Sequence, residues 1–110
     1  MRGRLLVVAS LVLLASAWTA HAQSGPRVAV QLFQFRPVGL EVTRGARVVW
    51  INQDDIIHTV TAGTPERRDG RFDLTLQGQG SAASVELTEP GLYPYFCERH
   101  PHMRGEIRVD

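Results

Sequence analysis

Apolar and polar residues alternate along several short segments of this chain, and glycine or proline interrupts most of them. In residues 27–35, for example, Val28, Val30 and Leu32 fall on one side of an extended backbone. Alternation with a period of two is typical of β-strands that bury one face. No stretch of ten or more residues beyond residue 22 shows helical periodicity. The pattern therefore predicts an all-β domain.

Eight segments are expected to form strands. They are residues 27–35, 40–43, 46–52, 56–61, 72–76, 82–88, 92–97 and 105–109. Residues 46–52 are apolar on both faces, which indicates a central strand under a second layer. Residues 62–71 contain two glycines, a proline and clustered charge, which favours a loop. Seven or eight short strands at this spacing predict a β-sandwich that forms a single domain.

The first 22 residues have the composition of a secretory signal peptide. Two arginines, Arg2 and Arg4, precede an apolar run over residues 5–18, and Ala20-His21-Ala22 is a small-x-small cleavage site. The apolar run is shorter than the roughly 20 residues that a membrane span needs. We therefore expect cleavage after Ala22, export to the periplasm or the cell exterior, and a mature domain of residues 23–110 without membrane insertion. An uncleaved anchor is the alternative.

The charge and cysteine content narrow the possible functions. Residues 23–110 contain ten of the twelve arginines and all eleven acidic residues, and the chain has no lysine, so the net charge of this part is −1. A near-neutral domain is a poor partner for nucleic acid or anionic membranes. Cys97 is the only cysteine, which excludes an internal disulfide. A free thiol in an exported domain needs another explanation.

A cluster of metal-ligand types supplies that explanation. Cys97, His100 and Met103 form a C-x2-H-x2-M pattern after a predicted strand, and His58 lies roughly forty residues upstream. A thiolate, two imidazoles and a weakly bound thioether form the ligand set of blue-copper electron-transfer sites. His102 is an alternative to His100. We favour His100 because His102 directly precedes Met103, and adjacent residues in an extended loop point apart.

These motifs resemble those of the cupredoxins, the small blue copper proteins that include plastocyanin, pseudoazurin and amicyanin. Residues 33–37 resemble the early F-x-F-x-P stretch of the family, and residues 48–54 resemble the strand that leads to its first ligand histidine. Residues 89–97 resemble the strand that leads to the copper thiolate. The short loop from Cys97 to Met103 is most similar to that of amicyanin. The resemblance covers nearly the whole mature domain.

The resemblance implies an eight-stranded Greek-key β-sandwich with one copper ion near one end. The copper ligands would be His58, Cys97, His100 and Met103. The sequence departs from the family pattern at two places. Ile57 stands where proline often precedes the first histidine, and Glu98 stands where a serine or threonine hydroxyl often links the ligand loops.

The expected function is that of a soluble, monomeric carrier of single electrons that cycles between Cu(II) and Cu(I). The resemblance implies that a redox donor and a redox acceptor dock transiently near the edge of His100. Four ligands leave no open metal position, so we do not expect an enzyme. Two alternatives remain: a copper protein for trafficking, storage or resistance, and a metal-free interaction module. The chain has only two methionines, which weakens the copper-handling alternative.

Overall fold

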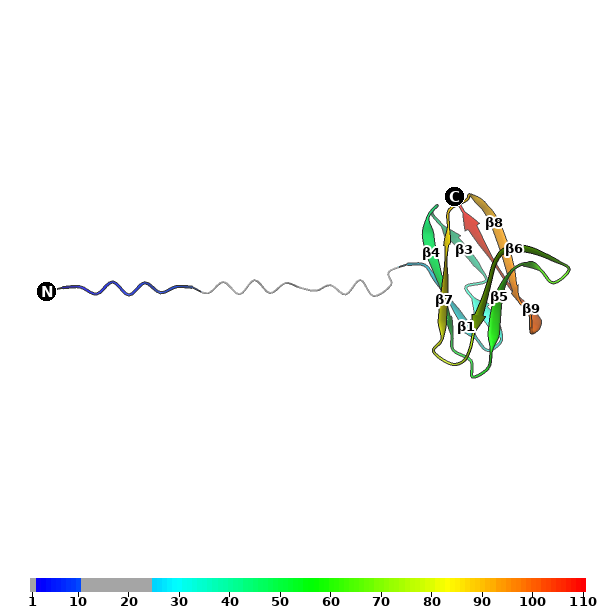
Figure 1. The fold of residues 1–110 in the computed structure, drawn as a ribbon, viewed down its shortest axis with the longest axis horizontal. Helices are drawn as coiled ribbons and strands as arrows, with labels where there is room; N and C mark the ends of the chain where they lie inside the picture. The colour runs from blue at the N-terminus through cyan, green and yellow to red at the C-terminus, as the bar shows by residue number, and fades with distance from the viewer. Residues whose placement is uncertain (1, 11–24) are drawn as a thin grey trace.

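The computed structural model of the chain describes residues 2–10 and 25–110 (Figure 1). Residues 2–10 form no helix or strand. The expected cleavage site at residues 20–22 and most of the apolar run before it lie outside the described residues. Residues 2–10 and 25–110 contain no helix that is long and apolar enough to cross a membrane.

Residues 25–110 fold into two packed β-sheets, which confirms the predicted all-β sandwich (Figure 1). The strands are β1 (Arg27–Gln31), β2 (Gln34–Arg36), β3 (Gly39–Val42), β4 (Ala46–Asn52), β5 (His58–Thr64), β6 (Arg67–Leu76), β7 (Ala82–Leu87), β8 (Gly91–Cys97) and β9 (His100–Val109). One sheet has the order β2-β1-β4-β7, and the other has the order β3-β9-β8-β5-β6. The pairs β1–β4 and β3–β9 are parallel, and the remaining pairs are antiparallel.

The core lies between the two sheets, because the alternating apolar residues of both sheets face inward. Val28 and Val30 on β1 are fully buried, as predicted. An aromatic cluster connects the two sheets: the ring of Tyr95 on β8 lies 5.4 Å from that of Trp50 on β4 and 4.8 Å from that of Phe35 on β2. Burying each large apolar side chain contributes about 1.5–3 kcal/mol. This packing holds the two sheets together.

Residues 27–35 do not form the single strand that the sequence predicts. They form a hairpin, in which β1 and β2 are joined by a two-residue turn at Leu32 and Phe33. Both turn residues have left-handed backbones, with φ of 52° and 60°. Leu32 is 66% exposed, so the prediction that it faces the core was wrong. Because this turn divides one predicted strand into β1 and β2, residues 25–110 form nine strands where the sequence predicts seven or eight.

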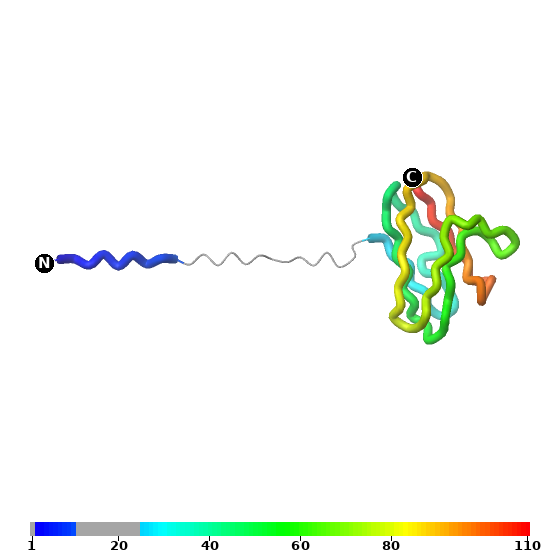
Figure 2. Tube along the Cα trace, in the orientation of Figure 1, coloured from blue at the N-terminus to red at the C-terminus, as the bar shows by residue number. Residues whose placement is uncertain are grey.

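Residues 62–71 form a second hairpin rather than a loop. Strands β5 and β6 pair as far as Thr64 and Arg67, and the register shifts between Thr61 and Gly63. Gly63 is needed at this bend, because its φ is 106° and a Cβ there would collide with the backbone of β6. We call residues 63–71 the arm, which projects from the side of the sandwich (Figure 2).

The five-stranded sheet brings three chain segments to one end of the sandwich. Strand β8 ends at Cys97, β9 begins at His100, and β5 begins at His58. Cys97 pairs directly with His100, whereas the preceding Phe96 pairs with Arg104. Residues 101–103 therefore have no partner on β8 and form a bulge at the start of β9. This end of the sandwich is where the sequence predicts the metal site.

Candidate metal centre

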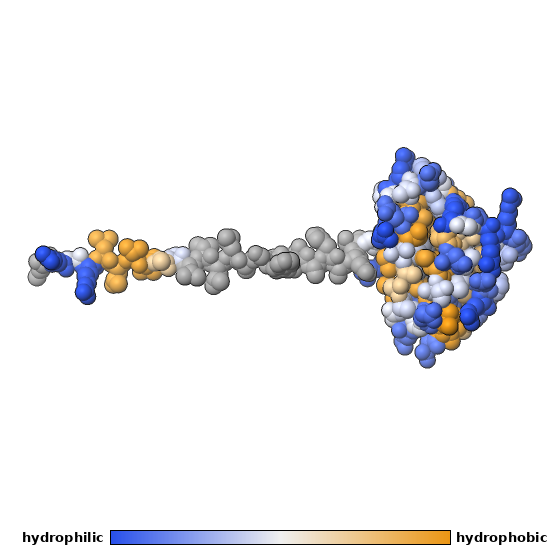
Figure 3. Space-filling model, in the orientation of Figure 1, coloured by the Kyte–Doolittle hydropathy of each residue, from blue (hydrophilic) through white to orange (hydrophobic). Residues whose placement is uncertain are grey.

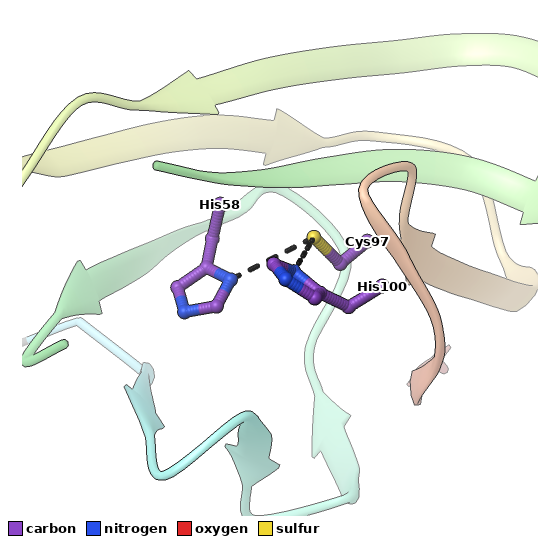
Figure 4. Close-up of side chains that lie close together, drawn as sticks. All are labelled: His58, Cys97 and His100. Atoms are coloured by element: carbon purple, nitrogen blue, oxygen red, sulfur yellow. Dashed lines mark hydrogen bonds between the residues drawn. The ribbon is translucent and has the colours of Figure 1, made fainter. Parts of the chain in front are cut away.

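His58, Cys97 and His100 point toward one another at the end of the five-stranded sheet (Figure 4). The Nδ1 atom of His58 lies 3.7 Å from Cys97 Sγ, and the Nδ1 atom of His100 lies at the same distance. All three ligand atoms lie within 4.8 Å of one another. His58 and Cys97 are fully buried, and His100 is partly exposed.

The spacing of these atoms fits a shared metal ion. Bonds of roughly 2.3 Å to sulfur and 2.0–2.1 Å to nitrogen, at tetrahedral to trigonal angles, separate a thiolate from an imidazole nitrogen by about 3.6–3.8 Å. Both observed sulfur–nitrogen distances of 3.7 Å fall in that range. A thiolate with two imidazoles is also the donor set that suits copper. The residues present therefore fit a copper ion.

Of the other two candidate ligands, Met103 is buried and His102 is exposed. Met103 is 2% exposed and belongs to the same buried cluster as Cys97, as a fourth ligand would require. His102 is exposed, and its ring lies 6.3 Å from that of His100. The structure thus brings His100, rather than His102, against the thiol of Cys97.

Asp54 holds the His58 ring from the side opposite to Cys97. Asp54 Oδ2 lies 2.8 Å from His58 Nε2, and the side chain of Asp54 is only 12% exposed. An ionised carboxylate can only accept hydrogen bonds, so Nε2 is the donor. In a neutral ring Nδ1 then keeps a free lone pair directed at the metal position. Hydrogen bonds of this kind fix the tautomer and orientation of metal-binding histidines.

The same carboxylate also organises the turn between β1 and β2. The N–H groups of Leu32 and Phe33 donate to Asp54 at 2.7 Å and 3.0 Å. Left-handed backbone costs roughly 1–2 kcal/mol for a residue other than glycine. Asp54 therefore offsets the strain of the turn while it orients His58.

This turn places an aromatic ring over both histidines. The ring of Phe33 meets His58 edge-on at 5.6 Å and His100 at 5.0 Å. Edge-to-face pairs of this kind contribute about 0.5–1.5 kcal/mol beyond the area that they bury. Phe33 therefore restricts the movement of the partly exposed His100 ring and covers one side of the site.

Asn52 shapes the loop that carries Asp54. It is fully buried at the end of β4. Its side-chain amide donates to the carbonyl of Ile56 at 2.7 Å, and its side-chain oxygen accepts the N–H of Asp54 at 2.9 Å. Such side-chain-to-backbone bonds define an Asx-type turn. The loop therefore leaves β4 in a fixed path and delivers Asp54 and His58 to the same site.

Thr59 links the two segments that carry His58 and Cys97. Its N–H lies 3.4 Å from Cys97 Sγ, where it can stabilise a thiolate. Its hydroxyl oxygen accepts the N–H of Glu98 at 2.8 Å and lies 3.0 Å from the hydroxyl of Thr61. Thr61 donates in turn to Asp73. The sequence departs from the family pattern at Glu98, and the hydroxyl of Thr59 provides a link at this point.

Two groups at the site have shifted pKa values. Burial opposes ionisation of Asp54, but hydrogen bonds from Phe33, His58 and Leu32 outweigh it and lower the pKa of that carboxyl. Burial lowers the pKa of His100, and the neighbouring positive charges act in the same direction. The first shift favours an ionised Asp54, and the second favours a neutral His100, which is the form of an imidazole that binds a metal.

Sequence reasoning missed Asp54, Thr59 and Phe33 as parts of the site. Asp54 gave a weak signal, because it precedes a candidate ligand by four residues in a polar loop. Phe33 gave none, since its contact with the histidines depends on a turn that contains neither glycine nor asparagine. The role of Thr59 depends on the pairing of β5 with β8, which is a tertiary feature.

A two-sheet β-sandwich with a His-Cys-His cluster at one end defines a cupredoxin-like copper protein. Residues 24–110 match the family described as "Copper binding proteins, plastocyanin/azurin family". The chain therefore belongs to that family. With the three-residue cluster, this membership shows that its cofactor is a single copper ion.

Individual relatives agree with this assignment. The amicyanin of Paracoccus denitrificans is 32% identical over 71 residues, which are 64% of this chain and 54% of that protein. A variant of amicyanin in its reduced Cu(I) form at pH 4 is similar in structure, with a TM-score of 0.67, 29% identity and coverage of 81% of this chain and 85% of that one. A purple cupredoxin from Nitrosopumilus maritimus shares the fold, with a TM-score of 0.70, 21% identity and coverage of 77% and 99%.

Proposed function

We propose that this protein carries single electrons between redox partners, with one copper ion held by His58, Cys97, His100 and Met103. The observation that carries the proposal is the pair of equal 3.7 Å distances from Cys97 Sγ to the two Nδ1 atoms. Similarity to amicyanin supports the same function. The bound copper supplies a one-electron couple between Cu(II) and Cu(I).

The protein's part is to keep the ligands in place while the charge of the site changes. His58, Cys97 and His100 lie at strand ends, where the backbone hydrogen bonds of the sheet fix their positions. Asp54 orients His58, and the N–H of Thr59 stabilises the thiolate. A preorganised site of this kind needs little rearrangement when an electron arrives or leaves.

The proposal includes the wider setting of the protein. Residues 1–22 would be removed as a signal peptide, and residues 23–110 would act as a monomeric domain in the periplasm or outside the cell. A set of four ligands leaves no open position for a substrate, so we propose a carrier and not an enzyme. The edge of His100 is the partly exposed part of the ligand set and would be the point of electron entry and exit.

Copper loading of the purified domain tests the proposal. We expect one copper per chain by metal analysis and an intense blue absorption in the Cu(II) form. Cys97→Ala should abolish the colour, because the colour requires a copper–thiolate bond. The matched control is His102→Ala, which should stay blue because His102 lies outside the cluster. A blue Cys97→Ala variant would refute the thiolate assignment.

Repeated reduction and oxidation distinguish a carrier from a copper-handling protein. A carrier should cycle many times in the presence of a competing chelator without losing its metal. A protein for trafficking or storage should instead release Cu(I) to the chelator within a few cycles. Loss of copper on reduction would therefore contradict the electron-carrier proposal.

A further inference from the structure

Exposed apolar residues lie on the segments next to His100, whose ring meets that of Phe33 at 5.0 Å. Leu32 and Phe33 are 66% and 43% exposed, Ile56 is 39% exposed, and Pro101 next to His100 is also exposed. We call these four residues the apolar patch. Asp54 links the turn that carries Leu32 and Phe33 to the loop that carries Ile56. It accepts the N–H of Leu32 and belongs to the same loop as Ile56. Figure 3 shows hydrophobic surface at the end of the domain where β5 begins.

Charged residues of the arm and of the loop after Cys97 form a cationic border to this end. We define the arginine rim by six charged residues: Arg67, Arg68, Arg99, Arg104, Glu66 and Glu98. Arg71 and Asp69 of the arm pair with each other and add no net charge. Glu98 pairs with Arg68, and Glu66 lies 3.8 Å from Arg104. Arg104 also donates to the carbonyl of Pro101 at 3.3 Å, which joins the rim to the apolar patch.

The rim has an excess of positive charge. Within the part of the chain that the structure describes, Arg67 and Arg99 form no ion pair. Arg99 directly precedes His100, and its charge is one of those that lower the pKa of His100. Four arginines against two glutamates give the rim a net charge of +2. Asp55, exposed next to Ile56, and the ionised Asp54 carry two negative charges on the loop before β5, so the excess of positive charge belongs to the rim and not to this whole end of the domain.

The charge of the rest of the domain has the opposite sign. Residues 23–110 have a net charge of −1, so this domain without the rim carries −3. At physiological salt, charges act on a docking partner over about 8 Å, and more distant charges are screened. A partner that touches the rim is therefore attracted mainly by these arginines and is little affected by the charge of the domain as a whole.

We propose that the partner of this surface is an acidic redox protein, whose apolar contact covers the patch and whose carboxylates meet the arginine rim. The inference rests on the proposed electron-carrier function and specifies the partner's chemistry. Arginine suits this role because its guanidinium binds carboxylates through two parallel hydrogen bonds. An apolar centre with a charged border is also the usual construction of a protein–protein contact. The arm is then a docking element that the family fold alone does not require.

A redox-inert anion maps the rim without electron transfer. Hexacyanochromate(III) carries three negative charges and broadens NMR signals near its binding site because it is paramagnetic. In the copper-free protein we expect the amide signals of residues 66–68, 98–100 and 102–104 to broaden first. Earliest broadening elsewhere on the domain, or none at all, would overturn the proposal. This measurement stands even if the copper site itself does not behave as proposed.

The salt dependence of electron transfer gives a second, independent readout. We expect oxidation of the Cu(I) protein by ferricyanide, an anion, to slow at least about threefold as ionic strength rises from about 10 to about 200 mM. The net charge of −1 alone predicts the opposite trend. Faster oxidation at high salt would therefore refute the inference, whereas absence of blue copper would refute the proposed function instead.

Two variants that each remove one positive charge distinguish the effect of the rim charge from that of the total charge of the domain. Arg99→Gln removes a rim charge, and we expect it to reduce the rate at low salt at least about twofold. Arg44→Gln is the control: Arg44 is exposed, forms no ion pair within the described residues and lies in the turn before β4, at the other end of the sandwich. Its rate should stay unchanged. Equal effects of the two variants would show that only total charge matters and would overturn the proposal.

Discussion

Replacing Asp54 with alanine should destabilise the copper-free domain, although Asp54 lies in a loop. The carboxylate accepts hydrogen bonds from Leu32, Phe33 and His58. The first two bonds hold a turn with left-handed backbone. The third satisfies the ring of a fully buried histidine. Asp54→Ala removes all three bonds at once.

The expected magnitude follows from the exposure of each donor. The N–H groups of Leu32 and Phe33 lie in an exposed turn and can bond to water after the change, so each loss costs about 0.5–1 kcal/mol. His58 is buried, and an unpartnered buried donor costs about 1–3 kcal/mol. The losses sum to between about 2 and 5 kcal/mol, and we take about 3 kcal/mol as the expected value. This is a large fraction of the stability of a domain of this size, which is usually about 5–15 kcal/mol.

Urea unfolding of the copper-free protein, followed by tryptophan fluorescence, measures this change. The matched control is Asp55→Ala. Asp55 is an exposed neighbour in the same loop, so its loss should change the free energy of unfolding by less than about 0.5 kcal/mol. If Asp54→Ala were as mild as Asp55→Ala, the three hydrogen bonds would contribute no net stability and the reasoning would fail.

A designed turn shows whether the loss comes from the hairpin or from His58. Leu32→Asn with Phe33→Gly supplies residues that favour left-handed backbone in two-residue hairpins. In the Asp54→Ala background this pair should recover about 1 kcal/mol or less, because the turn no longer depends on the carboxylate but the ring contacts of Phe33 with the two histidines are lost. Recovery of the full 3 kcal/mol would mean that the bond to His58 contributes nothing.

Three further predictions concern the core and the ligand loop. Gly105→Ala should cost about 2–3 kcal/mol in urea unfolding, because the new methyl group would collide with the ring of Tyr95. Burial raises the pKa of Tyr95 to about 12. Unfolded tyrosine titrates near pH 10, so the unfolded chain releases this proton first and stability falls as pH rises above about 10. The loss should reach about 1.4 kcal/mol near pH 11 and be absent in Tyr95→Phe. Thr59→Val should cost about 1 kcal/mol because the N–H of Glu98 loses its acceptor, whereas Thr59→Ser should be milder.

The sandwich could be predicted from the sequence because each strand carries its own signal. Alternation places Val28 and Val30 inside, and a strand that is apolar on both faces, such as β4, identifies a central position. The two errors occurred where tertiary contacts override local preference. The turn at Leu32 contains no typical turn residue, and the polar arm pairs as a hairpin although its composition favours a loop.

The candidate ligands could also be found, because cysteine, histidine and methionine at short spacing are rare outside metal sites. The residues that support them could not. Asp54, Thr59 and Phe33 are ordinary loop, strand and turn residues until the fold brings them to the site. A metal ligand can be recognised by its side-chain type. A residue that orients a ligand can be recognised only by its place in the folded structure, which depends on the whole chain.

The placement of Asp54 shows why this support cannot be read from one segment. His58, Cys97 and His100 all belong to the five-stranded sheet, whereas the turn of Leu32 and Phe33 belongs to the four-stranded sheet. Asp54 lies in the connection that crosses from one sheet to the other, and it bonds to both. A movement between the sheets at this end would therefore turn the His58 ring away from Cys97. The rigidity that an electron-transfer site needs thus depends on the packing of the two sheets as much as on the ligands themselves.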